Sequence, residues 1–415
     1  MSASTGSASP VFSLLVKPTG ASCNLACAYC FYLSREQLYP GSRLRMSDQV
    51  LEAYIGQLLA SQPAAQVCLG WQGGEPTLIG LDFFQRSIDL VKRYRRPGQQ
   101  VTYSLQTNGT RLDEAWCAFF KQHDFLVGLS VDGPPALHNT YRVDKGGQGS
   151  YDQVKRAWDL LQKHQVDTNI LCALHAVNAS HPLEVYRFFR DDLGARFIQF
   201  IPIVERLKPV SRFPAQEGHP APSGAKRPHS ARKGALVSPR SVDSCQYGQF
   251  LKEVFDEWLH HDVGTVFVQI FDSALASWCG LPSSLCIFQE TCGLSLVLEH
   301  NGDLYACDHF VEPAHRLGNI LERPMPELVS SSPQRQFGLA KRLRLPAYCQ
   351  QCEVRFACHG ECPRNRFIRN PSGDEAGLNY LCTGYRLFFQ HVDLPMRRMA
   401  ELLRLGRAPA EIMQI

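Results

Sequence analysis

Three cysteines near the N-terminus restrict the chemistry of this chain more than any other feature. Cys23, Cys27 and Cys30 follow a short apolar stretch and have the spacing C-x3-C-x2-C. Three thiolates from one tight loop can hold three irons of a 4Fe–4S cube, which leaves the fourth iron open to a substrate or cofactor. A zinc site that lacks its fourth ligand is the alternative interpretation.

The residues from about 11 to 204 alternate β-rich runs with amphipathic helical runs. Six such units predict an α/β fold with a parallel sheet and right-handed crossovers, a partial (βα)6 TIM-type barrel whose chemistry lies at the carboxyl ends of the strands. The predicted strands are Phe12–Lys17, Val67–Gln72, Thr102–Thr107, Leu126–Val131, Asn169–His175 and Phe197–Ile203. The predicted helices are Asp48–Leu59, Leu81–Tyr94, Glu114–Gln122, Tyr151–Lys163 and Leu183–Asp192.

After the barrel the pattern changes. A basic segment rich in Pro, Gly and Ser, 205–243, indicates a mobile linker or loop. A helix in 244–264 connects it to a cysteine-rich domain at 265–385, in which Asn301-Gly302 predicts a hairpin turn. The remainder, 386–415, is predicted to be a helical tail.

Composition narrows the function classes. The chain has 415 residues and 16 cysteines. Since no export signal is recognisable, we expect a reducing cytoplasm, where metal ligation is favoured over disulfides. No apolar run reaches the ~18 residues of a membrane span. The net charge of +4 is concentrated between residues 205 and 240, which argues against a nucleic-acid surface.

Further polar motifs fall at the ends of the predicted strands. Gly73-Gly74-Glu75-Pro76 follows the second strand, and Asn108 follows the third. Ser130 ends the fourth strand, and Arg142 lies in the loop beyond it. Two glycines allow close backbone approach, and a carboxylate can accept a hydrogen bond from an ammonium group.

The C-terminal cysteines form a second constellation. Cys292 and Cys307 are followed by a group with the spacing C-x2-C-x5-C-x3-C and then by one more cysteine. A zinc ribbon would explain two of these residues, and a ferredoxin would leave the barrel unexplained. The later group comprises Cys349, Cys352, Cys358, Cys362 and Cys382.

The C-x3-C-x-aromatic-C loop resembles the signature of the radical S-adenosylmethionine superfamily. The resemblance implies a 4Fe–4S cluster and a bound S-adenosylmethionine that is cleaved to a 5′-deoxyadenosyl radical. It also implies contacts to this cofactor from the backbone of Tyr29, from Ser130 and from Arg142, for which a solvated loop arginine is the alternative. The remaining implied contacts are Gly73, Gly74, Glu75 and Asn108.

The C-terminal spacing resembles the seven-cysteine SPASM pattern. The resemblance implies two auxiliary 4Fe–4S clusters, so that the chain would carry three clusters in all. Cys286 is the candidate for a fourth ligand of the first auxiliary cluster. That cluster would take Cys286, Cys292, Cys307 and Cys362, and the second would take Cys349, Cys352, Cys358 and Cys382.

Asp308 directly follows Cys307, and together with Trp71-Gln72 and Phe31-Tyr32 it resembles the anaerobic sulfatase-maturating enzymes. These oxidise a Ser or Cys in the sulfatase motif Cys/Ser-x-Pro/Ala-x-Arg to Cα-formylglycine. The resemblance implies Asp308 as catalytic base, Tyr32 and Gln72 as substrate contacts, and a flavodoxin- or ferredoxin-type electron donor. A hairpin-end residue bonded to backbone is the alternative for Asp308.

Two other function classes remain open. One is a SPASM enzyme that modifies a ribosomally made peptide, for example by a thioether crosslink. The other is a non-enzymatic iron–sulfur or zinc module. Only about twenty residues precede the first cluster cysteine, which counts against an added peptide-recognition domain.

Overall fold

The computed structural model describes residues 11–207, 236–371 and 377–414. Within these ranges one sheet has ten strands in the order β10-β9-β8-β1-β2-β3-β4-β5-β6-β7, and a separate pair joins β11 to β12. The strands are β1 Ser13–Val16, β2 Gln66–Trp71, β3 Gln100–Thr107, β4 Phe125–Ser130, β5 Thr168–Leu174, β6 Phe197–Pro202, β7 Phe267–Val268, β8 Ser295–Leu298, β9 Asp303–Tyr305, β10 Arg316–Asn319, β11 Arg366–Ile368 and β12 Leu378–Asn379.

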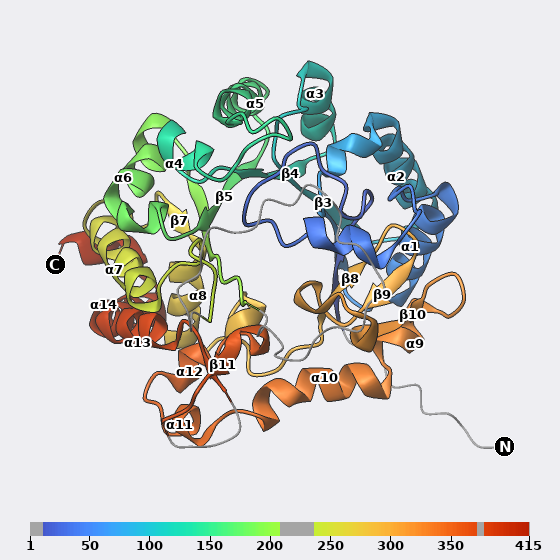
Figure 1. Cartoon of the computed structure of the whole chain (residues 1–415). Coiled ribbons are helices and arrows are strands. Elements are labelled where there is room, and N and C mark those ends of the chain that lie inside the picture. Colours follow the sequence, from blue (N-terminus) through green and yellow to red (C-terminus); the bar gives the residue numbers. More distant parts are fainter. Residues whose placement is uncertain (1–10, 208–235, 372–376, 415) are drawn as a thin grey trace, which may run out of the picture.

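The first six strands are parallel neighbours in chain order, and their crossover helices cover the outer face of the curved sheet (Figure 1). This confirms the predicted partial barrel. Side-chain caps fix where helices begin: Ser47 accepts a hydrogen bond from Val50 N, and Asp113 accepts one from Trp116 N. The helices are α1 Asp48–Ser61, α2 Leu81–Tyr94, α3 Glu114–Gln122, α4 Pro135–Asn139, α5 Tyr151–Lys163 and α6 Pro182–Arg187, which continues into a π-helical turn, η4 Phe188–Asp192.

The sheet extends beyond the six predicted strands at both edges. β7 adds to β6 in parallel, and β8 pairs in parallel with β1, from Ser13 opposite Ser295 to Val16 opposite Leu298. The predicted hairpin around Asn301-Gly302 joins β8 to β9. The cysteine-rich part therefore contributes strands to the barrel sheet, in which β8 lies between β1 and β9.

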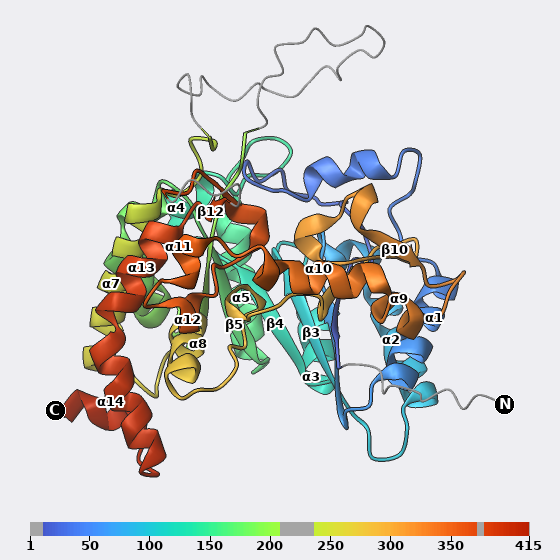
Figure 2. The same cartoon turned by 90° about the horizontal axis from the view of Figure 1, so that it is seen from below.

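The C-terminal helices bridge the two edges of the sheet. In Figure 1, α10, α11 and α12 cross the open side between β10 and α8. Figure 2 shows α4 at one end of the strands, the carboxyl end, and α14 toward the other. The helices that follow β6 are α7 Ser244–His261, α8 Gln269–Trp278, α9 Met325–Val329, α10 Ser332–Leu343, α11 Ala347–Gln350, α12 Arg355–Cys358, α13 Cys382–His391 and α14 Asp393–Arg404.

Two glycines allow α13 to pack closely on α7. A Cβ added to Gly384 would lie 2.1 Å from the carbonyl oxygen of Ser244, and one added to Gly248 would lie 2.7 Å from the Gly384 Cα. Beside this contact the rings of Tyr247 and Tyr385 meet edge to face, 5.3 Å apart. This junction ties the last helices to the barrel.

The segment 205–243 is described only at its two ends, so the prediction that it is mobile falls largely on residues outside the described ranges. The two ends pair with each other, although no pairing was predicted there. Leu207 N donates to Leu236 O at 2.9 Å, and Arg240 forms an ion pair with Glu205 at 2.7 Å.

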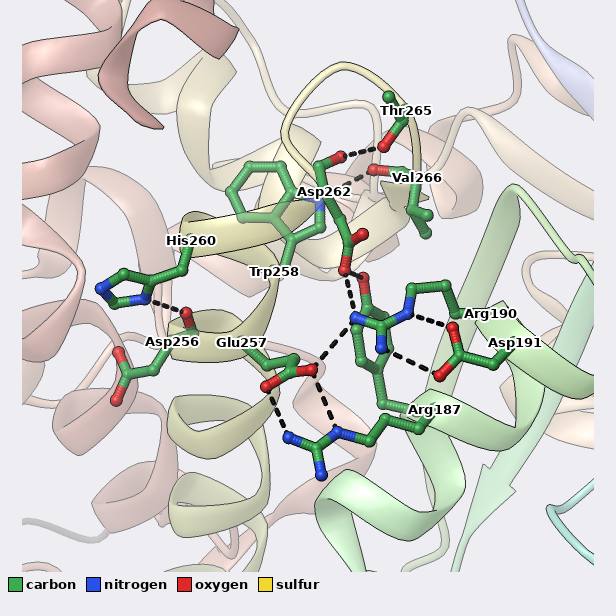
Figure 3. A network of polar contacts seen from close by, with 11 residues as sticks. Arg187, Arg190, Asp191, Asp256, Glu257, Trp258, His260, Asp262, Thr265 and Val266 are labelled. Atoms are coloured by element: carbon green, nitrogen blue, oxygen red, sulfur yellow. Dashed lines mark hydrogen bonds and ion pairs between the residues drawn. The ribbon is translucent and has the colours of Figure 1, made fainter. Parts of the chain in front are cut away.

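A polar network joins the helices outside the barrel (Figure 3). Glu257 on α7 accepts hydrogen bonds from Arg187 at 2.8 Å and from Arg190 at 3.1 Å. Asp262 accepts from Arg190 and from Tyr186, both at 2.8 Å. We call these five residues the scaffold network, because they fasten α6 and η4 to the end of α7. In the described residues no helix has the length and apolar character needed to cross a membrane.

Candidate active site

The loop after β1 carries the first three cysteines, and backbone hydrogen bonds hold it in place. Ala26 N donates to Val143 O at 2.8 Å, and the Asn108 amide nitrogen lies 3.6 Å from the Cys23 sulfur. Burial raises the pKa of the Cys23 thiol to about 12 and that of Cys27 to about 11, and the neighbouring thiols add to both shifts. The three thiols share one loop and influence one another's pKa, and metal ligation would release their protons.

The two glycines after β2 are required by a close approach to that loop. A Cβ added to Gly74 would lie 2.0 Å from Ser22 O. Gly73 has φ +136°, and a Cβ added there would lie 3.0 Å from Gly20 O. Gly74 N donates to Gly20 O at 2.9 Å. The strand-end loops of β1 and β2 therefore lie backbone against backbone.

Glu75 is fully buried, and its carboxylate is occupied by protein donors. One oxygen accepts from Thr77 N at 3.0 Å and from the Thr107 hydroxyl at 2.7 Å. The other accepts from Asn108 N at 2.8 Å. Burial raises the Glu75 pKa, and these hydrogen bonds oppose the shift. The side chain fastens the end of β2 to the end of β3.

Tyr29 and Arg142 meet on a buried carboxylate, Asp132, at the end of β4. Asp132 accepts a short hydrogen bond from the Tyr29 hydroxyl and pairs with Arg142 Nε at 2.9 Å. Arg142 is buried, so the alternative of a solvated loop arginine is wrong. Burial disfavours the Arg142 charge, but Asp132 raises its pKa. Ser130 lies at the end of the same strand, where its hydroxyl accepts from Gln106 at 3.1 Å.

Asp308 opens a short turn directly after Cys307, and its carboxylate is held by side chains from the other end of the chain. It accepts from the Tyr32 hydroxyl at 2.6 Å and from Arg35 at 2.9 Å, and it pairs with Lys17 Nζ at 2.9 Å. Lys17 also donates a short hydrogen bond to the Tyr32 hydroxyl. We call Lys17, Tyr32, Arg35 and Asp308 the site network. Its bonds to side chains rule out the backbone-bonded alternative for Asp308.

Lys17 and Asp308 influence each other's pKa. Lys17 is completely buried, whereas the Asp308 side chain is 14% exposed. Burial works against the charged carboxylate, but Lys17 and Arg35 hold the pKa of Asp308 well below its usual range. Burial lowers the pKa of Lys17, and Asp308 opposes that shift. Asp308 is therefore a carboxylate in the folded protein.

The eight auxiliary cysteines fall into two groups, within each of which thiols influence one another's pKa. In the first, burial raises the pKa of Cys307 to about 12, with further contributions from Cys286 and Cys292. Cys362 is buried and interacts with Cys307 and Cys292. The second group lines a small pocket; it comprises Cys349, Cys352, Cys358 and Cys382. All sixteen cysteines lie in described ranges, and all are free.

Gln72 follows β2, with its backbone N–H bonded to Val16 O at 2.9 Å. Its side-chain Oε1 is buried and has no hydrogen-bond partner among the described residues. An orphaned buried oxygen is costly unless a ligand satisfies it. The amide thus has capacity for a bound group near the end of β1, where Lys17 also lies.

Sequence reasoning missed several side chains that build this site. Lys17 was predicted only as the last residue of a strand, although a lysine that ends an otherwise apolar strand is a usable signal. Asp132 and Arg35 were given no role, and Arg35 carries no signal in the sequence. Lys341 and His309, which lie against the first auxiliary group, were also missed.

Comparison with protein families places two models on the chain. The Radical SAM superfamily model matches residues 18–189, and the SPASM iron–sulfur cluster-binding domain matches residues 286–353. These matches and the fold define a radical S-adenosylmethionine enzyme with a SPASM domain. Its cofactors are S-adenosylmethionine and a 4Fe–4S cluster, with additional iron–sulfur clusters in the SPASM domain.

The similar curated proteins agree with one another. A serine-type anaerobic sulfatase-maturating enzyme of Bacteroides thetaiotaomicron is 43% identical over 98% of this chain and 95% of its own length. A cysteine-type enzyme of Clostridium perfringens is 34% identical over 92% and 96%. The chain belongs to the anaerobic sulfatase-maturating enzyme family.

Solved structures extend the comparison. Native anSMEcpe with bound AdoMet and Cp18Cys peptide aligns with a TM-score of 0.80 at 33% identity, covering 95% of this chain and 100% of that one. Streptococcus suis SuiB bound to precursor peptide SuiA aligns with a TM-score of 0.56 at 14% identity, covering 86% and 73%. The second likeness shows a shared fold alone. The family membership contradicts the non-enzymatic module.

Proposed function

We propose that this enzyme oxidises a Ser or Cys of a sulfatase to Cα-formylglycine within the motif Cys/Ser-x-Pro/Ala-x-Arg. The observation that carries the proposal is the site network, which places the Asp308 carboxylate against Tyr32 directly beside Cys307. The family relationship supports the same reaction. A thioether-forming enzyme is not favoured, because the similar proteins over nine-tenths of the chain are sulfatase-maturating enzymes.

The cluster ligands follow the three thiol groups. Cys23, Cys27 and Cys30 hold the cluster with the open iron, and bound S-adenosylmethionine supplies a hydrogen-abstracting radical there. Cys286, Cys292, Cys307 and Cys362 hold the first auxiliary cluster. Cys349, Cys352, Cys358 and Cys382 hold the second. Zinc at the first loop is not favoured, because the loop lies within the Radical SAM match.

The cofactor contacts follow from the strand ends. The backbone of Gly73, Gly74 and Tyr29 and the side chains of Asn108, Ser130 and Arg142 are the proposed contacts. The Glu75 carboxylate fixes the shape of the glycine loop through its hydrogen bonds to Thr77, Thr107 and Asn108. Its second oxygen accepts only from Asn108 N among the described residues, so it can also accept from the cofactor's ammonium group, and Glu75 is a further proposed contact.

Asp308 takes the hydroxyl or thiol proton of the substrate. The low pKa of Asp308 keeps it ionised, so it can accept a proton, and hydrogen abstraction at Cβ makes the substrate proton more acidic than in the parent alcohol. Tyr32 holds the carboxylate in position and lines the substrate site. Gln72 offers the unpartnered amide oxygen to the bound peptide.

The remaining parts of the proposal are the domain bounds, the electron donor, the location and the target residue. We place the barrel at 1–204, the insert at 205–243, the connecting helix at 244–264, the SPASM domain at 265–385 and the tail at 386–415. A low-potential flavodoxin or ferredoxin supplies the electron, and the sixteen free cysteines support a reducing, cytoplasmic location. The higher identity to serine-type enzymes favours serine as target residue.

The test is anaerobic conversion of matched peptides by the iron-loaded enzyme, followed by mass spectrometry. A Ser peptide should lose two hydrogens as its alcohol becomes the aldehyde. A Cys peptide should lose two hydrogens and then exchange its sulfur for the oxygen of water, which gives the same aldehyde. We expect Ser to react faster. No aldehyde from either peptide, with cofactor cleavage intact, would contradict the proposal.

Replacing Cys23, Cys27 and Cys30 together by Ala should abolish cofactor cleavage. About two thirds of the iron should remain, because two of the three cubes keep their ligands. Iron analysis and 5′-deoxyadenosine assays measure both effects. Loss of nearly all iron from a folded variant would show that the ligand groups are wrong.

A further inference from the structure

The inner face of the barrel sheet carries a row of carboxamide side chains. Gln106 on β3 is paired with Gly128 on β4, and Gly128 is paired with Asn169 on β5. Gln72 follows the last paired residue of β2 and therefore lies next to Gln106 in the same register. Successive side chains of a strand point to opposite faces, and a direct neighbour of each residue lies in the core beneath the helices, so the row faces the barrel interior. We call Gln72, Gln106 and Asn169 the carboxamide row.

Gly128 provides the space that two of these side chains occupy. A Cβ added to Gly128 would lie 2.1 Å from Gln106 Oε1 and 2.9 Å from Asn169 Oδ1. Gly128 does not have a positive φ, so this position requires the absence of a side chain and not a special backbone conformation. The oxygens of Gln106 and Asn169 therefore come together over the backbone of β4.

The carboxamide row has hydrogen-bond acceptors that the protein does not use. Gln72 Oε1 and Asn169 Oδ1 are buried and have no partner among the described residues. The amide nitrogen of Gln106 donates to the Ser130 hydroxyl at 3.1 Å, which leaves its oxygen over Gly128. A buried carbonyl oxygen without a donor is unfavourable, so several of them in one place indicate a bound group that supplies N–H or O–H donors.

One end of the row lies at the site network. Lys17 follows β1 as Gln72 follows β2, and these two strands are paired in parallel. Lys17 also forms the ion pair with Asp308 at 2.9 Å. Neighbouring strands are about 4.8 Å apart, so the distance from β1 to β5 corresponds to at most about six residues of an extended chain. A polypeptide whose target residue lies at Asp308 can therefore reach Asn169.

Main-chain N–H groups are the donors that suit this row. Its oxygens are neutral, so they offer no charge for the recognition of a charged side chain. Main-chain hydrogen bonds give affinity without depending on side chains, which fits the two variable positions of the motif Cys/Ser-x-Pro/Ala-x-Arg. A proline in that motif has no N–H, so the variable residues and the arginine supply the donors.

We propose that Gln106 and Asn169 form a subsite over Gly128 that binds main-chain N–H groups of the substrate polypeptide beside its target residue. Gln72 continues this subsite toward Asp308. The inference deepens the proposed function and rests on it. Contact with Asp308 determines which residue reacts, and the carboxamide row holds the residues next to it.

The test is calorimetric titration of the iron-loaded enzyme with a Ser peptide that carries the motif, in the presence of S-adenosylhomocysteine, which forms no radical. Asn169→Leu replaces the carboxamide by an apolar side chain of similar size and should weaken peptide binding about tenfold. Its affinity for S-adenosylhomocysteine alone should stay within about twofold of wild type. Gly128→Ala keeps both carboxamides but displaces them, so it should also weaken peptide binding, and it decides the case if Asn169→Leu does not load iron.

Peptides with a single main-chain N-methyl group identify the donor. Methylation at one variable position or at the arginine should weaken binding to the wild-type enzyme about tenfold. The same peptide should lose little further affinity for Asn169→Leu, because the contact is already absent there. Losses that are fully additive at every position would contradict main-chain recognition by this row.

Thr168→Val is the matched control. Thr168 directly precedes Asn169 on β5, and its hydroxyl accepts from Gln162 of α5 at 3.1 Å on the outer face, so this variant should bind the peptide as wild type does. Unchanged peptide affinity in Asn169→Leu or, where that variant lacks iron, in Gly128→Ala would overturn the inference. Weaker binding of S-adenosylhomocysteine alone would assign the row to the cofactor, and loss of iron in both variants would assign it to the fold; either result overturns the inference. Absence of aldehyde from the wild-type enzyme would overturn the proposed function instead.

Discussion

The site network and the scaffold network contain the same kinds of side chain but differ in burial and in role. Each combines two cationic side chains and a tyrosine hydroxyl with carboxylates, one in the site network and two in the scaffold network. In the scaffold network Arg187 is 51% exposed, whereas Lys17 in the site network is completely buried. Solvent screens the Arg187 charge, so its ion pair with Glu257 is weaker than a fully buried pair. In the site network, removal of one charged side chain would leave a buried charge without a full set of partners.

The two networks also differ in what they join. The scaffold network connects the helices that Figure 3 draws, and Figure 1 shows α6 and α7 on the outside of the barrel. The site network connects the end of β1 to a turn almost three hundred residues later, and it adjoins a cysteine of the first auxiliary group. Replacing the corresponding side chain in each network should therefore distinguish residues that only stabilise the fold from residues that also take part in the reaction.

The largest contrast should come from removing one cation from each network. Lys17→Met leaves a buried carboxylate with less compensation, and we expect a loss of about 3 kcal/mol in unfolding free energy. Arg187→Met should cost about 0.5–1 kcal/mol, because its ion pair is half exposed. Urea unfolding under anaerobic conditions measures both. Equal losses would show that burial does not distinguish the networks.

A smaller contrast should come from the two tyrosine hydroxyls. Tyr186→Phe and Tyr32→Phe each remove one hydrogen bond to a carboxylate, at a cost of about 1–2 kcal/mol in stability. Only Tyr32→Phe should also slow aldehyde formation, by at least about tenfold, a barrier change of about 1.4 kcal/mol. Comparable activity loss in Tyr186→Phe would mean that the site effect is an indirect effect of stability.

The smallest effect should come from shortening the insert. Leu207 and Leu236 are already joined by a backbone hydrogen bond, so a short Gly-Ser turn can replace 208–235 without moving the stem. Neither network includes a residue of that range. Cofactor cleavage should stay within about twofold of wild type, an energetic change of under about 0.5 kcal/mol. A loss of cleavage would give the insert a role in assembling the site.

Much of the barrel was predictable because its strands and helices are local patterns. The helices Leu81–Tyr94, Glu114–Gln122 and Tyr151–Lys163 have the predicted bounds, since each shows clear apolar periodicity between caps and loops. The predicted helix Leu183–Asp192 occurs as α6 followed by a π-helical turn. The cysteine spacings were equally local, and they led to the correct family.

What sequence could not provide depends on contacts between distant segments. The parallel pairing of β8 with β1 has no local signature, and β7 has only two residues. The ion pair of Lys17 with Asp308 joins segments almost three hundred residues apart and could not be read from either segment alone. For the same reason the sequence did not show the protein donors to Glu75, which come from the end of β3 as well as from its own loop.

The most direct test of the central claim compares Asp308→Asn with Glu257→Gln. Both changes replace an arginine-bound carboxylate by an amide of nearly the same size, one in each network. Asp308→Asn should keep all its iron and still form some 5′-deoxyadenosine, while aldehyde formation on a Ser peptide falls by at least about a hundredfold. Glu257→Gln should convert the peptide at the wild-type rate. Aldehyde formation by Asp308→Asn near the wild-type rate, measured by mass spectrometry, would remove Asp308 from the mechanism.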